Sequence, residues 1–280
     1  MKRALFISRN LLGDGLNIAP ALRAWGMDHY FPAESEHPGE WCADLLTNND
    51  PIKEIYSRMG VDEYGGVMMS VINDELQRRP PYDFEFNFDV GKAFQIGQQK
   101  GLHITECYAD MLGVKIHEYT PTFITTEEEH EKDLVLLSPF SKSCESNEGR
   151  PPNKMLPWPK VDRLLCYLRR CGKVGILGAV NDRAPIEASE DEYYTGLSLN
   201  KVALMLRDAK FLVTVDNGIS HLAASQGTKS IVLYPACLDT RWIAPKGNPN
   251  AFVIHMNPVT LPLPSLIWQT GEILRQWKVI

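Results

Sequence analysis

The sequence has little that would place it in a membrane. No stretch of its 280 residues approaches the roughly 18 consecutive apolar residues that cross a bilayer. The opening residues MKRALFISRN have neither the apolar length of a signal peptide nor its small-residue cleavage site. With 44% hydrophobic and 23% charged residues, the composition is that of a globular protein. We therefore expect a folded, cytoplasmic protein.

Cysteine pairs with metal-binding spacing are also missing. The six cysteines include no C-x-x-C pair, and the closest two, Cys166 and Cys171, have no second pair to complete a zinc site. Free thiols in a reducing compartment are the simplest interpretation.

Positive charge is scarce in the first half of the chain. Residues 1–132 contain 12 Lys and Arg against 22 Asp and Glu, a balance of −10, whereas residues 133–280 contain 17 against 13, a balance of +4. The first half therefore has no general attraction for nucleic acid or anionic lipid. The second half suits an anionic ligand such as a nucleotide diphosphate.

Short apolar runs alternate with helix-compatible stretches along the first half. ALFISR (4–9) predicts a buried strand, LLGDG a tight loop, and residues 16–25 a helix with Pro20 near its first turn. The segments GGVMMSVI, YDFEFNFD and VKIHEY are consistent with further α/β units. The charge cluster TTEEEHEKD (125–133) is interpreted as a solvated surface segment that ends this domain.

A second α/β pattern starts directly afterwards. DLVLLSPFS predicts the first strand of a parallel sheet, and the strands KVGILGA, FLVTVD and SIVLYP follow with helices between them. The alternation predicts a doubly wound domain with ligands at the carboxyl ends of its strands. We therefore predict an α/β protein with two Rossmann-like domains facing a cleft, residues 1–132 and 133–262, and a terminal amphipathic helix (263–280) that could pack back on the first domain.

The strongest local motif is VDNGISHLAA (215–224). A buried strand is predicted to end at Asp216 and a helix to begin near Gly218. The backbone N–H groups of Asn217 to Ser220 would then point out of a helix N-terminus, where free donors and the helix dipole stabilise a pyrophosphate. Asn217 or Ser220 could cap the helix. For an isolated motif, an ordinary capped turn with His221 as a packed histidine is the simpler interpretation.

The context of this motif resembles glycosyltransferase family nine, the heptosyltransferase family. D-x-G-x-x-H-L-A-A is preceded by L-x-x-A-K-F and followed by G-T-x-x-I-V-L. The resemblance implies the GT-B fold and transfer of heptose from ADP-heptose to lipopolysaccharide core. The chain is a short form for this family, chiefly in its first half. The donor-binding positions that match are Asp216, Asn217 (in place of the more usual Thr or Ser), Gly218, Ser220 and His221.

A second segment, LLGDGLNIAPALRA (11–24), resembles the family's N-terminal loop, in which a Gly-Asp pair supplies the proposed base. The resemblance implies that Asp14 deprotonates the acceptor hydroxyl as it attacks the anomeric carbon. Gly13, Gly15 and Asn17 would support this loop. Capping of the following helix is an alternative role for Asp14, and the two roles are geometrically compatible.

Two further segments resemble elements that bind the donor. LLSPFSKSCES and NKMLPW resemble a Ser-containing strand end and a Lys-x-x-Trp-Pro element, here with slightly different spacing. This implies that Ser138 contacts the donor and that Lys154 contacts its phosphates. Lys142 is a competing candidate, and a solvated surface lysine is the alternative interpretation of Lys154.

The remaining donor positions are implied by the same resemblance. In ILGAVNDR, backbone groups of Leu177, Gly178 and Ala179 would read the nucleotide base, and Asp182 would hold ribose hydroxyls. CLDTRWIAP places Arg241 near the donor. No DxD motif of metal-dependent glycosyltransferases occurs, and EDE (190–192) is interpreted as a solvated acidic loop. No metal and no cofactor are therefore expected beside the nucleotide-sugar donor.

The predicted reaction is a one-step inverting sugar transfer. Asp14 takes the acceptor proton, and a nucleoside diphosphate held by Lys154 and residues 217–221 leaves. Two alternatives remain open. The first is a transferase acting on another hydroxyl, such as a hydroxymethylated DNA base, and the second is a nucleotide-sugar-binding protein without catalysis. The DNA alternative would require a basic stripe along the cleft, made of Arg78, Arg79, Lys92 and Lys100.

Overall fold

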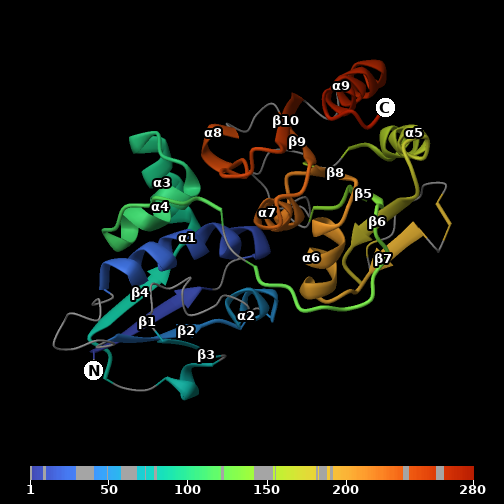
Figure 1. The fold of residues 1–280 in the computed structure, drawn as a ribbon. Helices are drawn as coiled ribbons and strands as arrows, with labels where there is room; N and C mark the ends of the chain where they lie inside the picture. Colours follow the sequence, from blue (N-terminus) through green and yellow to red (C-terminus); the bar gives the residue numbers. More distant parts are fainter. Residues whose placement is uncertain are drawn as a thin grey trace. The chain divides into compact units, whose positions relative to one another are not determined.

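The chain divides into two compact units (Figure 1). The N-terminal unit contains Met1–Ile124 and Arg241–Gly247, and the C-terminal unit contains Thr125–Thr240 and Asn248–Ile280. The computed structural model describes residues 2–8, 11–29, 41–48, 50–57, 68–72, 74–78, 81–120, 123–141, 154, 156–180, 182, 188–189, 192–235, 240–256 and 262–280.

The N-terminal unit is built on a four-stranded parallel sheet with the order β3-β2-β1-β4. Alternation in the β4 sequence FEFNF directs Phe84, Phe86 and Phe88 to one face, where Phe84 and Phe88 lie near the Phe6 ring of β1. The elements are β1 (Lys2–Ser8), α1 (Leu12–His29), β2 (Trp41–Leu46), α2 (Asp50–Ser57), β3 (Met68–Ile72), the 3-10 helix η2 (Glu75–Gln77), β4 (Phe84–Phe88), α3 (Val90–Lys100) and α4 (Ile104–Leu112).

Helix α1 starts earlier than the sequence predicted. It begins at Leu12 instead of near Leu16, so Pro20 lies well inside the helix and not near its first turn. The N–H of Gly15 donates to the carbonyl of Leu11 at 3.0 Å, which closes the first turn through the Gly-Asp-Gly segment. Glycine weakens a helix without preventing it. The acidic side chain of Asp14 in the first turn is favoured by the helix dipole.

Residues 241–247 follow β9 in the sequence but form part of the N-terminal unit. His103 Nε2 lies 2.8 Å from the carbonyl oxygen of Ala244, and Lys246 Nζ lies 3.3 Å from Glu106 Oε2 and 4.3 Å from the centre of the Tyr119 ring. Burial lowers the pKa of His103 to about 4, so its ring is neutral at pH 7 and Nε2 donates to the carbonyl. Residues 114–119, read from the sequence as part of an α/β unit, form no strand.

The C-terminal unit contains a six-stranded parallel sheet with the order β10-β9-β8-β5-β6-β7. Numbered within this unit and read from β7, the order is 3-2-1-4-5-6, the order of the Rossmann fold. The predicted α/β class is thereby confirmed. The elements are β5 (Val135–Ser138), α5 (Trp158–Leu168), β6 (Val174–Gly178), β7 (Tyr193–Thr195), α6 (Leu199–Arg207), β8 (Phe211–Val215), α7 (Gly218–Ser225), β9 (Ser230–Pro235), α8 (Thr240–Ile243), β10 (Ala251–Met256) and α9 (Leu263–Gln276).

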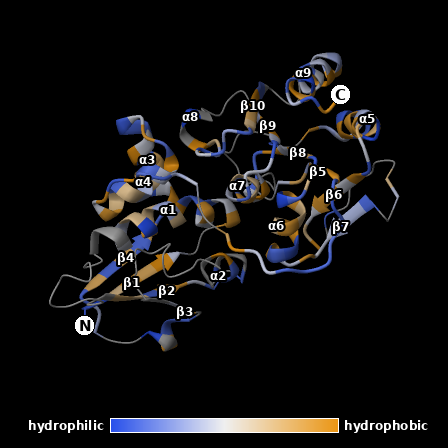
Figure 2. Ribbon diagram, viewed as in Figure 1, coloured by the Kyte–Doolittle hydropathy of each residue, from blue (hydrophilic) through white to orange (hydrophobic). Residues whose placement is uncertain are grey.

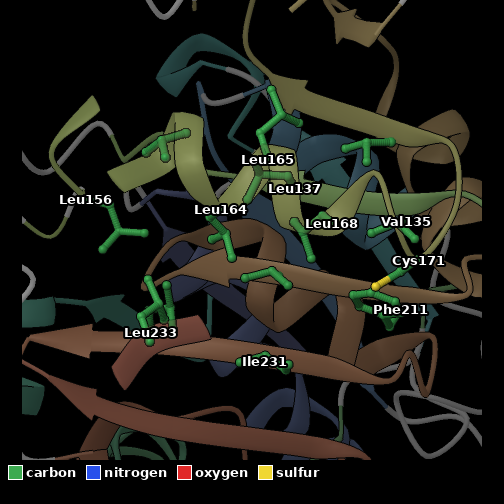
Figure 3. Close-up of a cluster of buried hydrophobic side chains, with 14 of the residues drawn as sticks. Val135, Leu137, Leu156, Leu164, Leu165, Leu168, Cys171, Phe211, Ile231 and Leu233 are labelled. Atoms are coloured by element: carbon green, nitrogen blue, oxygen red, sulfur yellow. The ribbon is translucent and has the colours of Figure 1, made fainter. Parts of the chain in front are cut away.

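The core of the C-terminal unit lies between this sheet and the helices α5 and α9. Leu164, Leu165 and Leu168 of α5 pack with residues of β5, β8 and β9 (Figure 3). The helices carry both hydrophobic and hydrophilic residues (Figure 2), as expected when one face lies on a sheet. The terminal helix α9 contributes Leu266 and Leu274 to the same core, so its apolar face packs within the C-terminal unit.

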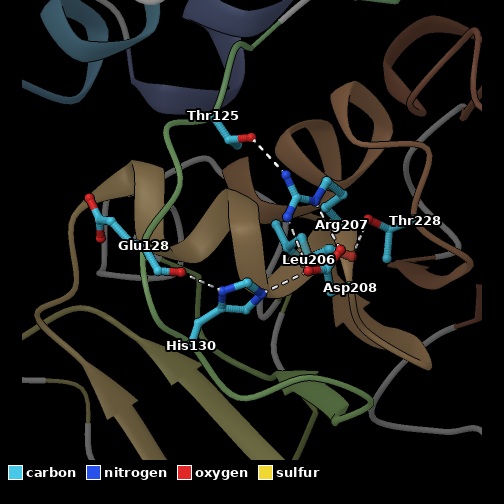
Figure 4. A network of polar contacts seen from close by, with 7 residues as sticks. All are labelled: Thr125, Glu128, His130, Leu206, Arg207, Asp208 and Thr228. Atoms are coloured by element: carbon cyan, nitrogen blue, oxygen red, sulfur yellow. Dashed lines mark hydrogen bonds and ion pairs between the residues drawn. The ribbon is translucent and has the colours of Figure 1, made fainter.

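The charge cluster 125–133 is largely exposed, as predicted, but several of its residues are held by the C-terminal unit. Predicted as solvated, it contacts α6 of the C-terminal unit (Figure 4). His130 Nε2 lies 2.9 Å from Asp208 Oδ2, and Asn200 donates to Glu128 at 2.8 Å and accepts from the N–H of Thr126 at 2.8 Å. Glu128 and Glu131 find partners because the C-terminal unit supplies donors that sequence spacing does not reveal.

Candidate functional site

The two strands at the middle of the Rossmann sheet, β5 and β8, define its switch point. Chain order reverses between them, so the helices that follow the two strands leave on opposite faces and open a crevice at their carboxyl ends. In register, Ser138 of β5 stands beside Thr214 of β8. Both are buried, and Thr214 Oγ1 donates to the carbonyl of Ser138 at 3.2 Å. Ser138, a predicted donor-binding residue, therefore lies beside the end of β8, and the predicted residues from Asp216 onward follow that strand.

Asn217 links these two strand ends. Its Oδ1 accepts from the backbone N–H groups of Ile219 at 2.9 Å and Ser220 at 3.2 Å, so Asn217 is the N-cap of α7. Its Nδ2 donates to Ser138 Oγ at 3.1 Å and to the carbonyl of Phe140 at 2.8 Å. Of the four N–H groups predicted to face a pyrophosphate, those of Ile219 and Ser220 are therefore taken by the cap, whereas those of Asn217 and Gly218 are not used by it.

Asp216 and Lys154 form a partly buried ion pair at the same edge. Lys154 Nζ lies 2.5 Å from Asp216 Oδ2, and the side chains are 24% and 7% exposed. Lys154 is thus not a solvated surface lysine. Burial, and next the nearby Asp216 carboxylate, raise the pKa of Tyr234 well above its usual value, so this phenol stays protonated. Ser220 Oγ on α7 donates to the carbonyl of Asn217 at 2.7 Å.

The carboxyl end of β6 forms a tight turn beside β5. Leu177 is buried in the core, and the N–H of Ala179 donates to Asp182 Oδ2 at 2.6 Å. Gly178 lies so close to its neighbours that a Cβ there would meet Asp182 Cβ at 2.8 Å and the Phe140 ring at 3.0 Å. Here Asp182 closes its own turn, and a role toward ribose hydroxyls stays a prediction.

Asp14 lies in the N-terminal unit, in the first turn of α1. The turn is supported by Asn17, which donates from Nδ2 to the carbonyl of Gly13 at 3.0 Å and accepts from Thr105 Oγ1 of α4 at 3.1 Å. Gly15, the other predicted supporting residue, is buried in the same turn. Asp14 is half-buried. Because α1 begins at Leu12, Asp14 lies inside the first turn and is not the capping residue that precedes the helix.

Other predicted positions fall outside these two groups. His221 is a buried residue of α7, only 7% exposed. Arg241 is exposed and counted with the N-terminal unit, and its contact with a donor stays a prediction. Lys142, Arg79 and residues 190–191 of the acidic loop lie outside the described residues.

Two of the four basic residues considered for DNA binding, Arg78 and Lys100, are paired with carboxylates. Arg78 pairs with Glu85, and Lys100 Nζ lies 2.7 Å from both carboxylate oxygens of Asp110. Across the described ranges, we find no group of three His, Cys, Asp or Glu side chains suited to a metal ion. No helix in the part of the chain that the structure describes is long and apolar enough to cross a membrane.

Sequence reasoning missed two residues of the switch point. Phe140 contributes its carbonyl to Asn217 and its ring to the wall beside Gly178. Tyr234, at the end of β9, supplies a fully buried hydroxyl near Asp216. A polar aromatic residue at the end of a buried strand was the available signal for Tyr234. Nothing in the sequence distinguishes Phe140 from an ordinary apolar loop residue.

Part of the C-terminal unit matches the sequence model of a known protein family. The model of glycosyltransferase family 9 (heptosyltransferase) matches residues 193–258, which include β8, α7 and β9. No curated protein sequence matches the chain. Among solved structures, a family 9 glycosyl transferase from Veillonella parvula has a TM-score of 0.70 at 13% identity, over 98% of this chain and 97% of that one.

Two enzymes from E. coli are also similar in structure. The ADP-heptose lps heptosyltransferase II has a TM-score of 0.68 at 15% identity, over 99% of this chain and 100% of that one. The heptosyltransferase WaaC, solved with ADP, has a TM-score of 0.59 at 17% identity, over 97% of this chain and 98% of that one. The chain therefore has the predicted GT-B fold of two Rossmann-like domains. With the sequence match over 193–258, this confirms the resemblance to glycosyltransferase family 9.

Proposed function

We propose that this protein transfers a heptose-like sugar from an ADP-linked donor to an acceptor hydroxyl. The observation that carries the proposal is the convergence of Ser138, the Lys154–Asp216 pair and the N-terminus of α7 at the switch point of a Rossmann sheet. Nucleotides bind at such switch points. Further support comes from the E. coli enzyme WaaC, whose solved structures include one with ADP and one with ADP-2-deoxy-2-fluoro heptose.

The donor diphosphate is bound by three kinds of group in this proposal. Ser138 Oγ accepts a hydrogen bond from Asn217. The hydroxyl hydrogen of Ser138 therefore remains able to donate to a phosphate. Gly218 offers its N–H at the positive end of α7. Lys154 turns from Asp216 toward the diphosphate and offsets the charge that develops on it as it leaves. The charge is thereby offset without a metal ion.

The chemical step is a direct displacement at the anomeric carbon. The acceptor oxygen forms a bond to this carbon while the bond to the diphosphate oxygen breaks and its electrons stay with ADP. Asp14 takes the proton of the acceptor hydroxyl as general base. Attack from the side opposite the leaving group inverts the anomeric configuration. A core saccharide of lipopolysaccharide is the acceptor that we propose.

A nucleotide panel tests the donor. Thermal unfolding is followed with ADP, UDP, GDP and their sugars, because a ligand at 100 times its Kd stabilises the folded state by about 2.7 kcal/mol. We expect the largest shift with ADP and ADP-heptose and a smaller ADP shift in Lys154→Met. A preference for UDP or GDP would overturn the ADP assignment. No shift with any nucleotide would overturn the donor site, and binding without transfer would support the non-catalytic alternative.

A further inference from the structure

We propose that Asn217 is a positioning residue: it ties the loop after β5 to the N-terminus of α7 and so preorganises the diphosphate site. The inference rests on the proposed function, which supplies the ligand. The side chain of Asn217 need not touch the ligand, because its Oδ1 and Nδ2 are already engaged within the protein.

The chemistry of the amide assigns its orientation. Nδ2 carries two hydrogens, and its two neighbours, Ser138 Oγ at 3.1 Å and the carbonyl of Phe140 at 2.8 Å, both accept. Oδ1 faces the N–H groups of Ile219 and Ser220, which only donate. A flipped amide would place donor against donor and acceptor against acceptor. These four contacts therefore fix one orientation of the amide, and Thr214 Oγ1 also lies 3.3 Å from its Oδ1.

No other short polar side chain can make these contacts together. A serine or threonine hydroxyl caps a helix, but it has one hydrogen and cannot donate to two acceptors. An aspartate caps equally well, but its carboxylate faces the Phe140 carbonyl without a hydrogen. Among these residues, only asparagine both caps α7 and binds the β5 loop at two points. The two bonds that Asn217 accepts come from α7. The two bonds that it donates go to the last residue of β5, Ser138, and to Phe140 in the loop after it.

The consequence concerns which groups remain for an anion. With Asn217 in place, the hydroxyl hydrogen of Ser138 is directed away from the amide, and the N–H groups of Ile219 and Ser220 are occupied. Among the described residues, Ser138 Oγ and the N–H of Gly218 then remain as donors at these strand ends, together with the backbone N–H of Asn217 and with Lys154. Asn217 holds the first two at a fixed separation although they come from different strand ends, and such preorganisation lowers the ordering cost of binding.

The test uses the full-length protein and the variant Asn217→Ser, which is neutral and keeps a capping oxygen. Amide hydrogen exchange is measured at residues 138–141, and ADP affinity is measured by calorimetry. We expect faster exchange at 138–141 and about tenfold weaker ADP binding, the size expected for losing one or two hydrogen bonds. Asn217→Asp should weaken ADP binding further, because it adds negative charge.

Asn200→Ser is the matched control. Asn200 is likewise an asparagine of the C-terminal unit that both donates and accepts, but it is fully buried, whereas Asn217 is half-buried, and its partners are Glu128 and Thr126. We expect a comparable loss of thermal stability with unchanged ADP affinity and unchanged exchange at 138–141. A general loss of stability would affect the two variants alike.

The outcomes separate this inference from the proposed function. Unchanged exchange at 138–141 in Asn217→Ser would overturn the tie, whether or not nucleotides bind. Faster exchange with unchanged ADP affinity would show a tie that does not position the site and would also overturn the inference. A wild-type protein that binds no nucleotide, with exchange still faster in the variant, would instead overturn the proposed function.

Discussion

The two units have the same strand order over four parallel strands, but they differ in the side chains that lie at their switch points. The N-terminal sheet runs β3-β2-β1-β4 and the C-terminal sheet begins in the same way with β7-β6-β5-β8. In each, a side chain caps the helix after the last of these strands: Asp89 accepts from the N–H of Lys92 at 2.7 Å, and Asn217 accepts from Ile219 and Ser220. A carboxylate has no hydrogen to donate across to the neighbouring strand, whereas an amide has two. A shared topology therefore does not make two equal binding sites.

The largest expected effect is on the rate of transfer, and it tests whether the N-terminal unit supplies the base while the C-terminal unit binds the donor. Asp14→Asn removes the proposed base but keeps a side chain of the same size. We expect the rate of transfer to fall by about 10²–10⁴-fold, the usual contribution of a general base. The affinity for ADP, which we assign to the C-terminal unit, should stay unchanged. Single-turnover transfer from ADP-heptose and ADP calorimetry measure the two quantities.

Asp89→Asn is the control for this prediction. It removes another carboxylate at the start of a helix in the N-terminal unit while keeping an oxygen that caps α3. Transfer should stay within a few-fold of wild type. Equal losses in Asp14→Asn and Asp89→Asn would assign the effect to general electrostatics of the acidic unit and would remove Asp14 as the base.

The next effect concerns the cores of the two units. Leu164 is fully buried in the large cluster around β5, and Leu5 is fully buried in a smaller cluster with Leu46 and Ile72. Each change to alanine should cost about 2–5 kcal/mol, depending on how far the cavity collapses. If the units unfold separately, Leu164→Ala lowers the transition that ADP raises and Leu5→Ala lowers the other. Urea unfolding with and without ADP measures these transitions. A single transition shared by both variants would contradict separate unfolding of the two units.

The sequence predicted β5, β6, β8 and β9 of the C-terminal unit because their signals are local, but it missed the outer strands β7 and β10. Continuous apolar runs such as FLVTV are typical of buried parallel strands, and β8 consists of that run. The start of α1 was misplaced because glycines at 13 and 15 are typical of a loop, although the turn closes as a helix. The ties of Asn217 to Ser138 and Phe140 span more than 70 residues of sequence, so no spacing could reveal them.

A smaller effect tests the charge pair at the C-terminal switch point. Lys154→Met leaves the Asp216 carboxylate, 7% exposed, without its cation. We expect a loss of about 1–3 kcal/mol in the free energy of unfolding, since Lys154 is partly exposed and water moderates the penalty. ADP affinity should fall about tenfold.

Lys173→Met is the matched control for the charge pair. Its ion pair with Glu131 has side chains that are 57% and 38% exposed. Such a surface pair contributes about 0–1 kcal/mol, and its loss should leave ADP affinity unchanged. An unchanged ADP affinity in Lys154→Met as well would remove Lys154 from the donor site.

The smallest effect is the pH dependence of the contact between residues 125–133 and α6. The side chain of Arg207, and less strongly His130, lower the pKa of Asp208 from its usual 3.8 to about 2. Because the folded-state pKa is the lower one, Asp208 stabilises the fold fully above pH 4, and this contribution is lost as the pH falls toward 2. Asp208→Asn should therefore cost about 0.2–1 kcal/mol at pH 5, the size of a partly exposed surface pair, and almost nothing at pH 2. Urea unfolding of both proteins across this range measures the difference. A difference that stays constant down to pH 2 would show that Asp208 acts through packing and not through its charge, and the C-terminal unit would then hold its boundary segment by shape alone.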